Sequence, residues 1–491
     1  MKQIKFIFSL CFIFSLCFIF GNTKTSIPNL FYSKMENGLD VFVYEDSSTP
    51  LAYIEIAVKG GGRAQTKETA GLFHLYEHMM FKGNSLYNNS AAVQKAITDL
   101  GVTTWNGSTS SEYIYYYFTV PSNMLEKGLQ VWSAAIREPL MREDELESEK
   151  KVVISEIQGG FANPGSIIRA GYQRFLFSNS PWKLDPAGTV ENVQNATVQN
   201  LIDIKNKFYI PNNSALFIGG DVSHDNVFEL VKKIYGSWEK VEDPWESKDS
   251  FSNVNEFDNS LKEDVYLVFP QEEISPQFSP INIYYHGPST INDEESTYGA
   301  DIWTSIMESP SNKLAKTLYN NSALEILSQD YTSAAYITQR ESGLIVFQTQ
   351  IASPFKILPR RVQNLFEQLY YDEIPKMVSD KTYYSKDEIK TSKNRLKDDV
   401  IIDSQTPESF LTNLRFWWSA TSPDYYFNYH KKLNKVSVKN ISNFIMKYLL
   451  NKHAVICVFV NPQVYEIQKE AFDEAGFIKI DSSNAYWFLN K

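Results

Sequence analysis

The sequence predicts an α+β protein made of two homologous α/β domains, each with a mostly antiparallel sheet covered by helices on one side. Segments that alternate like half-buried strands are interleaved with segments of helical periodicity. A diverged internal repeat is also present, because three residue pairs recur at separations of 238 to 240 positions: Tyr209 and Tyr448, Asn213 and Asn451, Gly236 and Gly476. The 491 residues suffice for two large domains.

The N-terminal segment, residues 1–25, has the features of a secretory signal peptide. Lys2 and Lys5 give it a basic end, and a fifteen-residue apolar run follows from Phe6 to Phe20. Because this run is slightly short for a membrane span, we expect cleavage near residues 21–25, with an uncleaved N-terminal anchor as the alternative. We therefore expect an exported protein of the periplasm or cell envelope. Its one remaining cysteine, Cys457, cannot form an internal disulfide.

The net charge argues against two classes of partner. The formal charge of −11 is unfavourable for nucleic acids and for anionic membrane surfaces. We expect no nucleic-acid partner, and membrane contact only through an uncleaved signal. The negative charge of the protein is more compatible with basic or neutral peptides as partners.

In chain order, the first domain begins with strand patterns and continues with helices. We expect strands within 31–58, a helix over 71–83, a helix near 90–100, strands at 103–110 and 113–120, helices up to 207, a strand at 214–221 and a helix at 225–235. A polar stretch then separates the two copies of the repeat. From the positions of the two copies and of this polar stretch, we predict an N-terminal domain over 26–240, a linker over 241–262 and a C-terminal domain over 263–491.

The helix over 71–83 carries the strongest chemical signal. Leu72, Leu75 and Met79 supply an apolar stripe, while His74 and His78, four residues apart, lie one above the other on the opposite side. Two imidazoles so placed can bind one metal ion. Glu77 lies beside them, where it can take a proton from a metal-bound water. The pattern is the inverted zincin motif His-x-x-Glu-His.

A catalytic zinc site has a third protein ligand and an open position. Cys457 is far away in an apolar run, so we expect the third ligand to be a carboxylate. Glu149 and Glu156, seven residues apart, lie two turns apart on one side of a predicted helix. Alternatively, these acidic residues could simply face solvent. This interpretation suits Glu143 to Glu147, but it suits Glu156 poorly because the apolar residues Val152, Val153 and Ile154 come shortly before it.

With these residues the chain resembles peptidases of the M16 family, which includes pitrilysin, insulin-degrading enzyme and mitochondrial processing peptidase. That family pairs His-x-x-Glu-His with two later Glu residues spaced as Glu149 and Glu156 are here. Further blocks resemble the family in its order, namely Lys34-Met-Glu-Asn-Gly-Leu-Asp, Trp105-Asn-Gly-Ser-Thr-Ser-Ser-Glu112, Pro181-Trp182 with Gly188, and Tyr209-Ile-Pro-Asn-Asn-Ser. The resemblance implies a half-clamshell of two domains, with the metal site in the first only.

The resemblance also implies roles for individual residues. His74, His78 and Glu156 correspond to the zinc ligands, with one Zn²⁺ per chain; Glu77 corresponds to the general base, and Glu149 to a carboxylate that orients a ligand histidine. An edge strand that binds substrate corresponds to Trp105, Asn106 and Gly107. For Trp105 and for the tyrosines at 113, 115, 116 and 117, ordinary sheet packing is the favoured alternative.

The second half lacks a feature that the family uses to bind substrate. At the positions of the family's Arg and Tyr, seven residues apart, this chain has Tyr319 and Ile326. Two domains also make only half of the chamber that single-chain members enclose. We therefore expect a dimer, with a second M16-like subunit favoured over a second copy of this chain.

The sequence thus predicts a zinc-dependent metalloendopeptidase that hydrolyses short or unfolded peptides, with Glu77 acting as general base on a zinc-bound water. A catalytically silent M16-like subunit for assembly or binding is the main alternative. A zinc hydrolase of other specificity is a third hypothesis.

Overall fold

The computed structural model describes residues 23–25, 27–102, 104–178, 185–246, 261–353, 357–403 and 405–486. Residues 1–22 of the predicted signal, residues 247–260 of the predicted linker, and Pro181 and Trp182 lie outside the described residues. The predicted domain limits remain predictions. Within the described ranges, no helix combines the length and the apolar character needed to cross a bilayer.

The first half of the chain forms a seven-stranded mixed sheet in the order β1-β2-β3-β7-β4-β6-β5. Its strands are β1 (Thr23–Lys24), β2 (Leu30–Lys34), β3 (Asp40–Glu45), β4 (Leu51–Lys59), β5 (Trp105–Thr109), β6 (Tyr113–Pro121) and β7 (Ser214–Gly220). Neighbouring strands are antiparallel except β3 and β7, which are parallel. Strand β5 forms one edge of the sheet and pairs with β6 only among the described strands.

The second half forms a six-stranded sheet in the order β10-β11-β9-β12-β8-β13. Its strands are β8 (Val265–Pro270), β9 (Phe278–Gly287), β10 (Ser333–Ile337), β11 (Gly343–Ala352), β12 (Val455–Val460) and β13 (Ile478–Lys479). Strands β8 and β12 are parallel, as β3 and β7 are in the first sheet. Read from the other edge, β8-β12-β9-β11-β10 repeats β3-β7-β4-β6-β5, which confirms two related sheet-and-helix domains.

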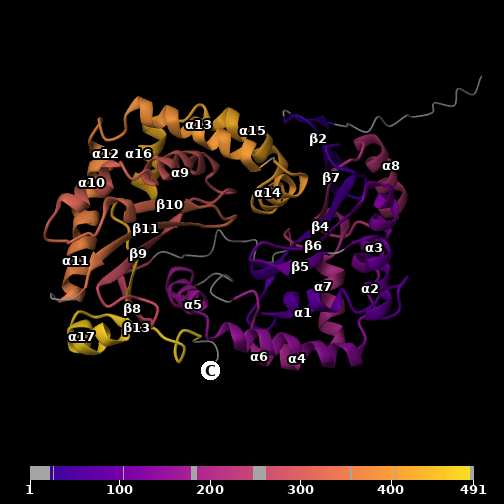
Figure 1. Ribbon diagram of the computed structural model, residues 1–491, viewed down its shortest axis with the longest axis horizontal. Coiled ribbons are helices and arrows are strands. Elements are labelled where there is room, and N and C mark those ends of the chain that lie inside the picture. Colours follow the sequence, from indigo (N-terminus) through magenta and orange to yellow (C-terminus); the bar gives the residue numbers. More distant parts are fainter. Residues whose placement is uncertain are drawn as a thin grey trace, which may run out of the picture.

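Helices surround both sheets (Figure 1). The first half contributes the short 3-10 helix η1 (Gly61–Ala64), α1 (Leu72–Met79), α2 (Ser90–Asp99), α3 (Leu125–Arg137), α4 (Glu143–Gly160), α5 (Pro164–Leu176), α6 (Val190–Asn195), α7 (Val198–Phe208) and α8 (His224–Tyr235). The second half contributes α9 (Glu294–Met307), α10 (Lys313–Asn320), α11 (Leu358–Gln368), α12 (Ile374–Ser379), α13 (Lys386–Asp403), α14 (Pro407–Ala420), α15 (Pro423–Leu433), α16 (Val438–Tyr448) and α17 (Pro462–Glu474).

One face of each sheet is covered by helices of its own half. In the first half, apolar side chains of α1, α3, α4, α7 and α8 form a single buried core with the sheet. In the second half, α9, α11 and α16 pack on the sheet in the same way. The apolar stripe predicted for the helix over 71–83 is part of the first core, since Leu72, Leu75 and Met79 are buried.

The opposite faces are covered by an exchange of helices between the halves, so the expectation of helices on one side only is wrong. Helix α14 places Phe410, Leu411 and Leu414 on the first sheet, against Phe42 and Phe217. Helix α5 of the first half does the same for the second sheet: Leu176 lies with Leu267 and Phe269, and the Tyr172 ring stacks on Tyr284 with 4.1 Å between centroids. In Figure 1 both helices lie between the two sheets. Local periodicity could not predict this, because the partners are far apart in sequence.

Candidate functional site

Helix α1 is fixed at its N-terminus by a close backbone contact. Gly71 precedes the helix with φ +93°, a left-handed conformation that favours glycine. A Cβ on Gly71 would lie 2.7 Å from the Ala187 carbonyl oxygen and 2.9 Å from the Gly188 Cα. The segment before α6 therefore holds the start of α1 at a defined position. With its apolar stripe in the core, α1 turns His74 and His78 toward the opposite side.

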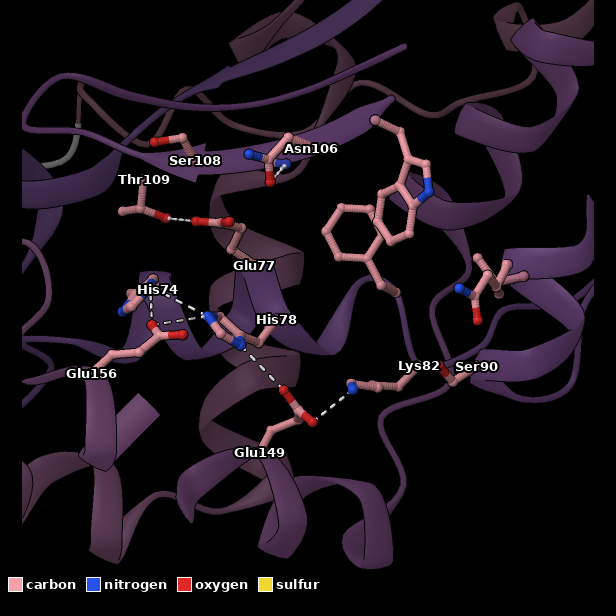
Figure 2. A pocket seen from close by; sticks show the side chains of 15 residues that line it. His74, Glu77, His78, Lys82, Ser90, Asn106, Ser108, Thr109, Glu149 and Glu156 are labelled. Atoms are coloured by element: carbon pink, nitrogen blue, oxygen red, sulfur yellow. Dashed lines mark hydrogen bonds and ion pairs between the residues drawn. The ribbon is translucent and has the colours of Figure 1, made fainter. Parts of the chain in front are cut away.

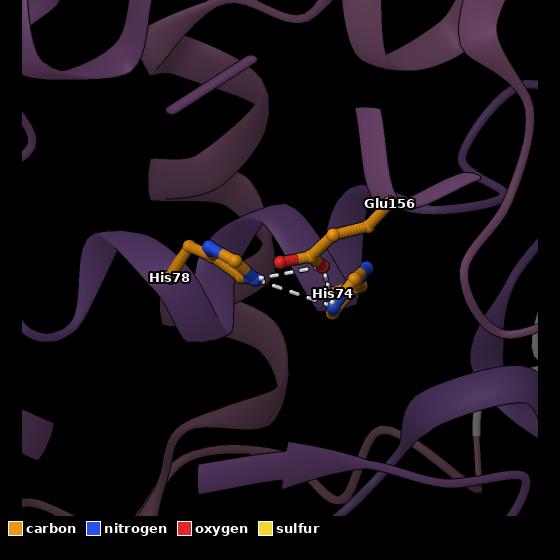
Figure 3. A group of neighbouring side chains, drawn as sticks. All are labelled: His74, His78 and Glu156. Atoms are coloured by element: carbon orange, nitrogen blue, oxygen red, sulfur yellow. Dashed lines mark hydrogen bonds and ion pairs between the residues drawn. The ribbon is translucent and has the colours of Figure 1, made fainter. Parts of the chain in front are cut away.

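His74, His78 and Glu156 converge on one point (Figure 3). The Nε2 atoms of His74 and His78 are 3.3 Å apart, and each lies 3.5 Å from Glu156 Oε2. One candidate ligand atom from each residue lies within 4.8 Å of the other two. Glu156 reaches this point from α4, and about half of its side chain is exposed (49%). The group is thus open to solvent on the Glu156 side.

These three side chains fit a zinc ion chemically. Burial lowers the pKa of His74 to about 4, and the neighbouring His78 adds to this effect, so the His74 imidazole is neutral near pH 7. Neutral imidazole nitrogens and a carboxylate oxygen are ligands that Zn²⁺ accepts, and three such ligands leave a coordination position free. Lone pairs that face one another at these distances are also best satisfied by a cation between them.

Glu149 contacts one of the two imidazoles. Its Oε2 atom lies 3.1 Å from His78 Nδ1, and its Oε1 atom lies 2.6 Å from Lys82 Nζ (Figure 2). Glu149 is buried (6% exposed), unlike the acidic residues earlier on α4. A hydrogen on His78 Nδ1 that donates to Glu149 leaves the Nε2 lone pair directed at Glu156 and His74. The sequence placed Glu149 on this helix face, but it did not reveal Lys82.

Glu77 is buried on the side of α1 that faces β5. Its Oε2 atom accepts a hydrogen bond of 2.7 Å from Thr109 Oγ1. Burial raises the pKa of Glu77, and the Thr109 hydrogen bond opposes the rise. Figure 2 shows the Glu77 carboxylate between β5 and the two histidines. A carboxylate in this position can exchange a proton with a molecule bound between α1 and the strand.

A cleft of about 570 Å³ opens over these groups and is lined by α1, α2, α4 and β5. Trp105, Asn106 and Gly107 line it, and their role in binding substrate stays a prediction. The Trp105 ring also packs on Phe81 with 4.7 Å between centroids, so packing and cleft lining coexist at this residue. Sequence reasoning missed further lining residues, namely Phe81, Lys82, Ser90, Val93, Gln94, Ser108 and Thr109.

Two signals in the sequence could have identified some of the missed residues. Lys82 follows His78 by four residues, and Thr109 follows Gly107 by two, so each shares a side of its segment with a predicted site residue.

The tyrosines of β6 pack within the protein, as the alternative interpretation of the sequence predicted. Tyr116 is buried and hydrogen-bonds Tyr209 at 3.0 Å, while Tyr115 lies under the Arg415 guanidinium.

Tyr319 and Ile326 lie away from the cleft. Tyr319 is exposed (44%) on α10, whereas Ile326 is buried in the second core and bridges to Ile351. Figure 1 shows α10 and α1 on opposite sides of the molecule. Neither side chain therefore contributes to the cleft of its own chain.

The chain matches two family models in succession. Residues 41–176 match the model described as insulinase (peptidase family M16), and residues 195–390 match the one described as the peptidase M16 inactive domain. Together these matches cover both halves of the chain. The candidate ligands and Glu77 all fall within the first match.

Curated relatives share about a quarter of their residues with this chain. An uncharacterized zinc protease of Rickettsia felis is 25% identical over 214 residues, which is 44% of this chain and 52% of the relative. Zinc protease PqqE of Helicobacter pylori is 27% identical over 213 residues, 43% of this chain and 47% of the relative. Mitochondrial-processing peptidase subunit beta of Bos taurus is 26% identical over 211 residues, 43% and 42% of the two chains. The matched region thus spans about half the length of these relatives.

Among solved structures, the first half of the periplasmic protease PqqL from Escherichia coli has the same fold. It superposes with a TM-score of 0.71 and 16% identity, and the match covers 93% of this chain and 97% of that one. At this identity the likeness concerns the fold, and it agrees with the two-domain architecture described above.

Proposed function

The chain belongs to the M16 peptidase family, and from that premise we propose that it is a zinc-dependent endopeptidase that cleaves short or unfolded peptides. The observation that carries the proposal is the convergence of His74, His78 and Glu156, with Glu77 on the same helix as the two histidines. His74, His78 and Glu156 hold one Zn²⁺ per chain, and Glu77 is the general base.

The residues divide the chemical work. A Zn²⁺ ion held by His74, His78 and Glu156 would supply Lewis acidity to a water molecule and to the scissile carbonyl. Glu77 takes the proton from the attacking water and delivers it to the leaving amine. Glu149 fixes the His78 ring through Nδ1, so that Nε2 points into the site.

Substrate binds along β5. This strand is at the sheet edge and lines the cleft with Trp105, Asn106 and Gly107, so an extended peptide can add as a further strand through main-chain hydrogen bonds. Only flexible or unfolded segments offer a free backbone edge. The site therefore selects unfolded peptides and leaves stably folded domains intact.

We further propose that the active species is a dimer, with a second M16-like subunit favoured over a second copy. Tyr319 and Ile326 provide no cationic group for substrate, and a related subunit that keeps the family's Arg and Tyr would supply one. One relative of this chain is named as a subunit, which supports an assembly of more than one chain. Export to the periplasm or cell envelope remains our prediction from the basic and apolar N-terminus.

The alternative is a catalytically silent subunit. Peptide cleavage by the parent protein and by a Glu77 variant distinguishes the two proposals. The purified protein should carry about one zinc per chain and should cleave an unstructured peptide, alone or with a partner subunit. A chelator should stop cleavage and added zinc should restore it.

Glu77→Gln should keep the zinc and lose about 10²- to 10⁴-fold in kcat. Equal cleavage rates for Glu77→Gln and the parent would refute the mechanism, and activity appearing only on mixing would identify a heterodimer.

A further inference from the structure

We propose that Thr109 is a positioning residue for the general base: from the end of β5 it holds the Glu77 carboxylate in the orientation needed to accept a proton. The inference rests on the proposed function, because it assigns a role to a residue around the same base. It adds that a single strand both receives the substrate and positions the base.

The contact between Thr109 and Glu77 joins two elements that are otherwise separate. Thr109 Oγ1 donates to Glu77 Oε2 at 2.7 Å, from the last residue of β5 to a residue near the end of α1. Thr109 itself is held in register by pairing with Ile114 of β6. As a β-branched residue it has few side-chain rotamers, so its hydroxyl is a well-fixed donor.

Gly107 supplies the surface on which the Glu77 carboxylate rests. A Cβ built on Gly107 would lie 3.1 Å from Glu77 Oε1 and 3.2 Å from Glu77 Cγ. Gly107 and Thr109 are two residues apart and therefore lie on one face of β5. Gly107 leaves room for the glutamate, and Thr109 binds one of its two oxygens.

The Glu77 carboxylate is supported by the Thr109 hydroxyl and, more weakly, by the Thr109 backbone N–H. In the part of the chain that the structure describes, the hydrogen bonds to its carboxylate come from Thr109 alone. A glutamate side chain has three rotatable bonds, and a base must lie within hydrogen-bond reach of the proton that it abstracts. With Oε2 bound to Thr109, Oε1 stays available to the attacking water. Without the hydroxyl only the weaker contact with the Thr109 backbone N–H remains, so the carboxylate would sample other rotamers more often.

The test compares three substitutions in the full chain, assayed with whatever partner the parent needs. Thr109→Val removes the hydroxyl but keeps the shape and suits a strand, whereas Thr109→Ser keeps the hydroxyl. Thr119→Val is the matched control, because it removes a threonine hydroxyl from β6 outside the cleft. For each variant, kcat, KM, zinc retention in a chelator titration and Tm are measured.

We expect Thr109→Val to lower kcat by about 10- to 100-fold, a part of what a general base contributes, while KM, zinc retention and Tm stay at parental values. Thr109→Ser should recover most of the rate, and Thr119→Val should behave like the parent.

Parental kcat in Thr109→Val, or an equal loss in Thr109→Ser, would overturn the inference while leaving the proposed function standing. A loss of zinc or a lower Tm that accounts for the drop in rate would overturn it too, because Thr109 would then be structural. A parent protein without metal-dependent cleavage would overturn the proposed function, and this inference with it.

Discussion

Glu55 on β4 and Arg415 on α14 are 360 positions apart in the chain, yet their side chains form an ion pair that solvent does not reach. Glu55 is 0% and Arg415 3% exposed. The Arg415 guanidinium also lies over the Tyr115 ring at 3.5 Å, and the Tyr53 hydroxyl donates to Glu55 at 2.5 Å. The pair thus joins α14 of the second half to the sheet on which α1 packs.

Removing one partner of this pair should be costly. Burial raises the pKa of Glu55 to about 7 even beside Arg415, so in Arg415→Met this carboxyl must either stay charged without a partner or take up a proton, and we expect the free energy of unfolding to fall by about 3 to 5 kcal/mol. Adding Glu55→Gln to that variant should recover part of the loss, because no buried ionisable group is then left without its partner. Urea unfolding measures both effects. Arg360→Met, in an exposed pair with Glu367, is the control and should change stability by less than about 1 kcal/mol.

Local patterns were sufficient for the elements and for part of the site. The apolar stripe of α1 and the four-residue spacing of His74 and His78 are properties of one helix, and the structure brings both imidazoles to Glu156. The helix is shorter than the stretch 71–83 suggests and ends at Met79. The contact of Thr109 with Glu77 and that of Glu55 with Arg415 join different elements. They depend on how the elements pack, which periodicity does not encode.

Glu149 should matter for metal affinity rather than for folding. Glu149→Gln weakens the acceptor for His78 Nδ1, so we expect zinc affinity to fall by roughly 10- to 100-fold. A chelator competition at fixed pH measures this. Glu143→Gln, on the exposed first turn of the same helix, should retain zinc like the parent. Parental zinc affinity in Glu149→Gln would leave Glu149 with no role at the metal site.

Asp301 should make the protein less stable as the pH rises. Burial raises the pKa of this α9 carboxyl to about 7, although the Tyr429 hydroxyl donates to it at 2.7 Å and limits the rise. In the unfolded chain the pKa of Asp is about 3.9. Because the folded value is the higher one, the stabilising contribution is complete below about pH 4 and is lost as the pH rises through 7.

Asp301→Asn removes this titration and retains an acceptor for Tyr429. We expect the stability of the variant relative to the parent to increase from pH 5 to pH 8, by on the order of 2 kcal/mol in urea unfolding. Asp399→Asn, at an exposed position of α13, should show no such difference between the two pH values. An equal loss of stability at both pH values would show that Asp301 is ionised in the folded protein.

The exchange of α5 and α14 predicts that the two halves unfold together. Each helix covers the face of the other half's sheet that the helices of that half leave open, so neither half can unfold without exposing a buried apolar surface of its partner. Leu414 on α14 and Leu176 on α5 are both fully buried (0% exposed), and truncation to Ala at such sites costs about 2 to 5 kcal/mol. We expect one calorimetric transition in the parent, and both Leu414→Ala and Leu176→Ala should move that single transition to lower temperature. Two resolved transitions, with each substitution shifting only one of them, would mean that the halves are independent folding units and that the exchanged helices contribute little to stability.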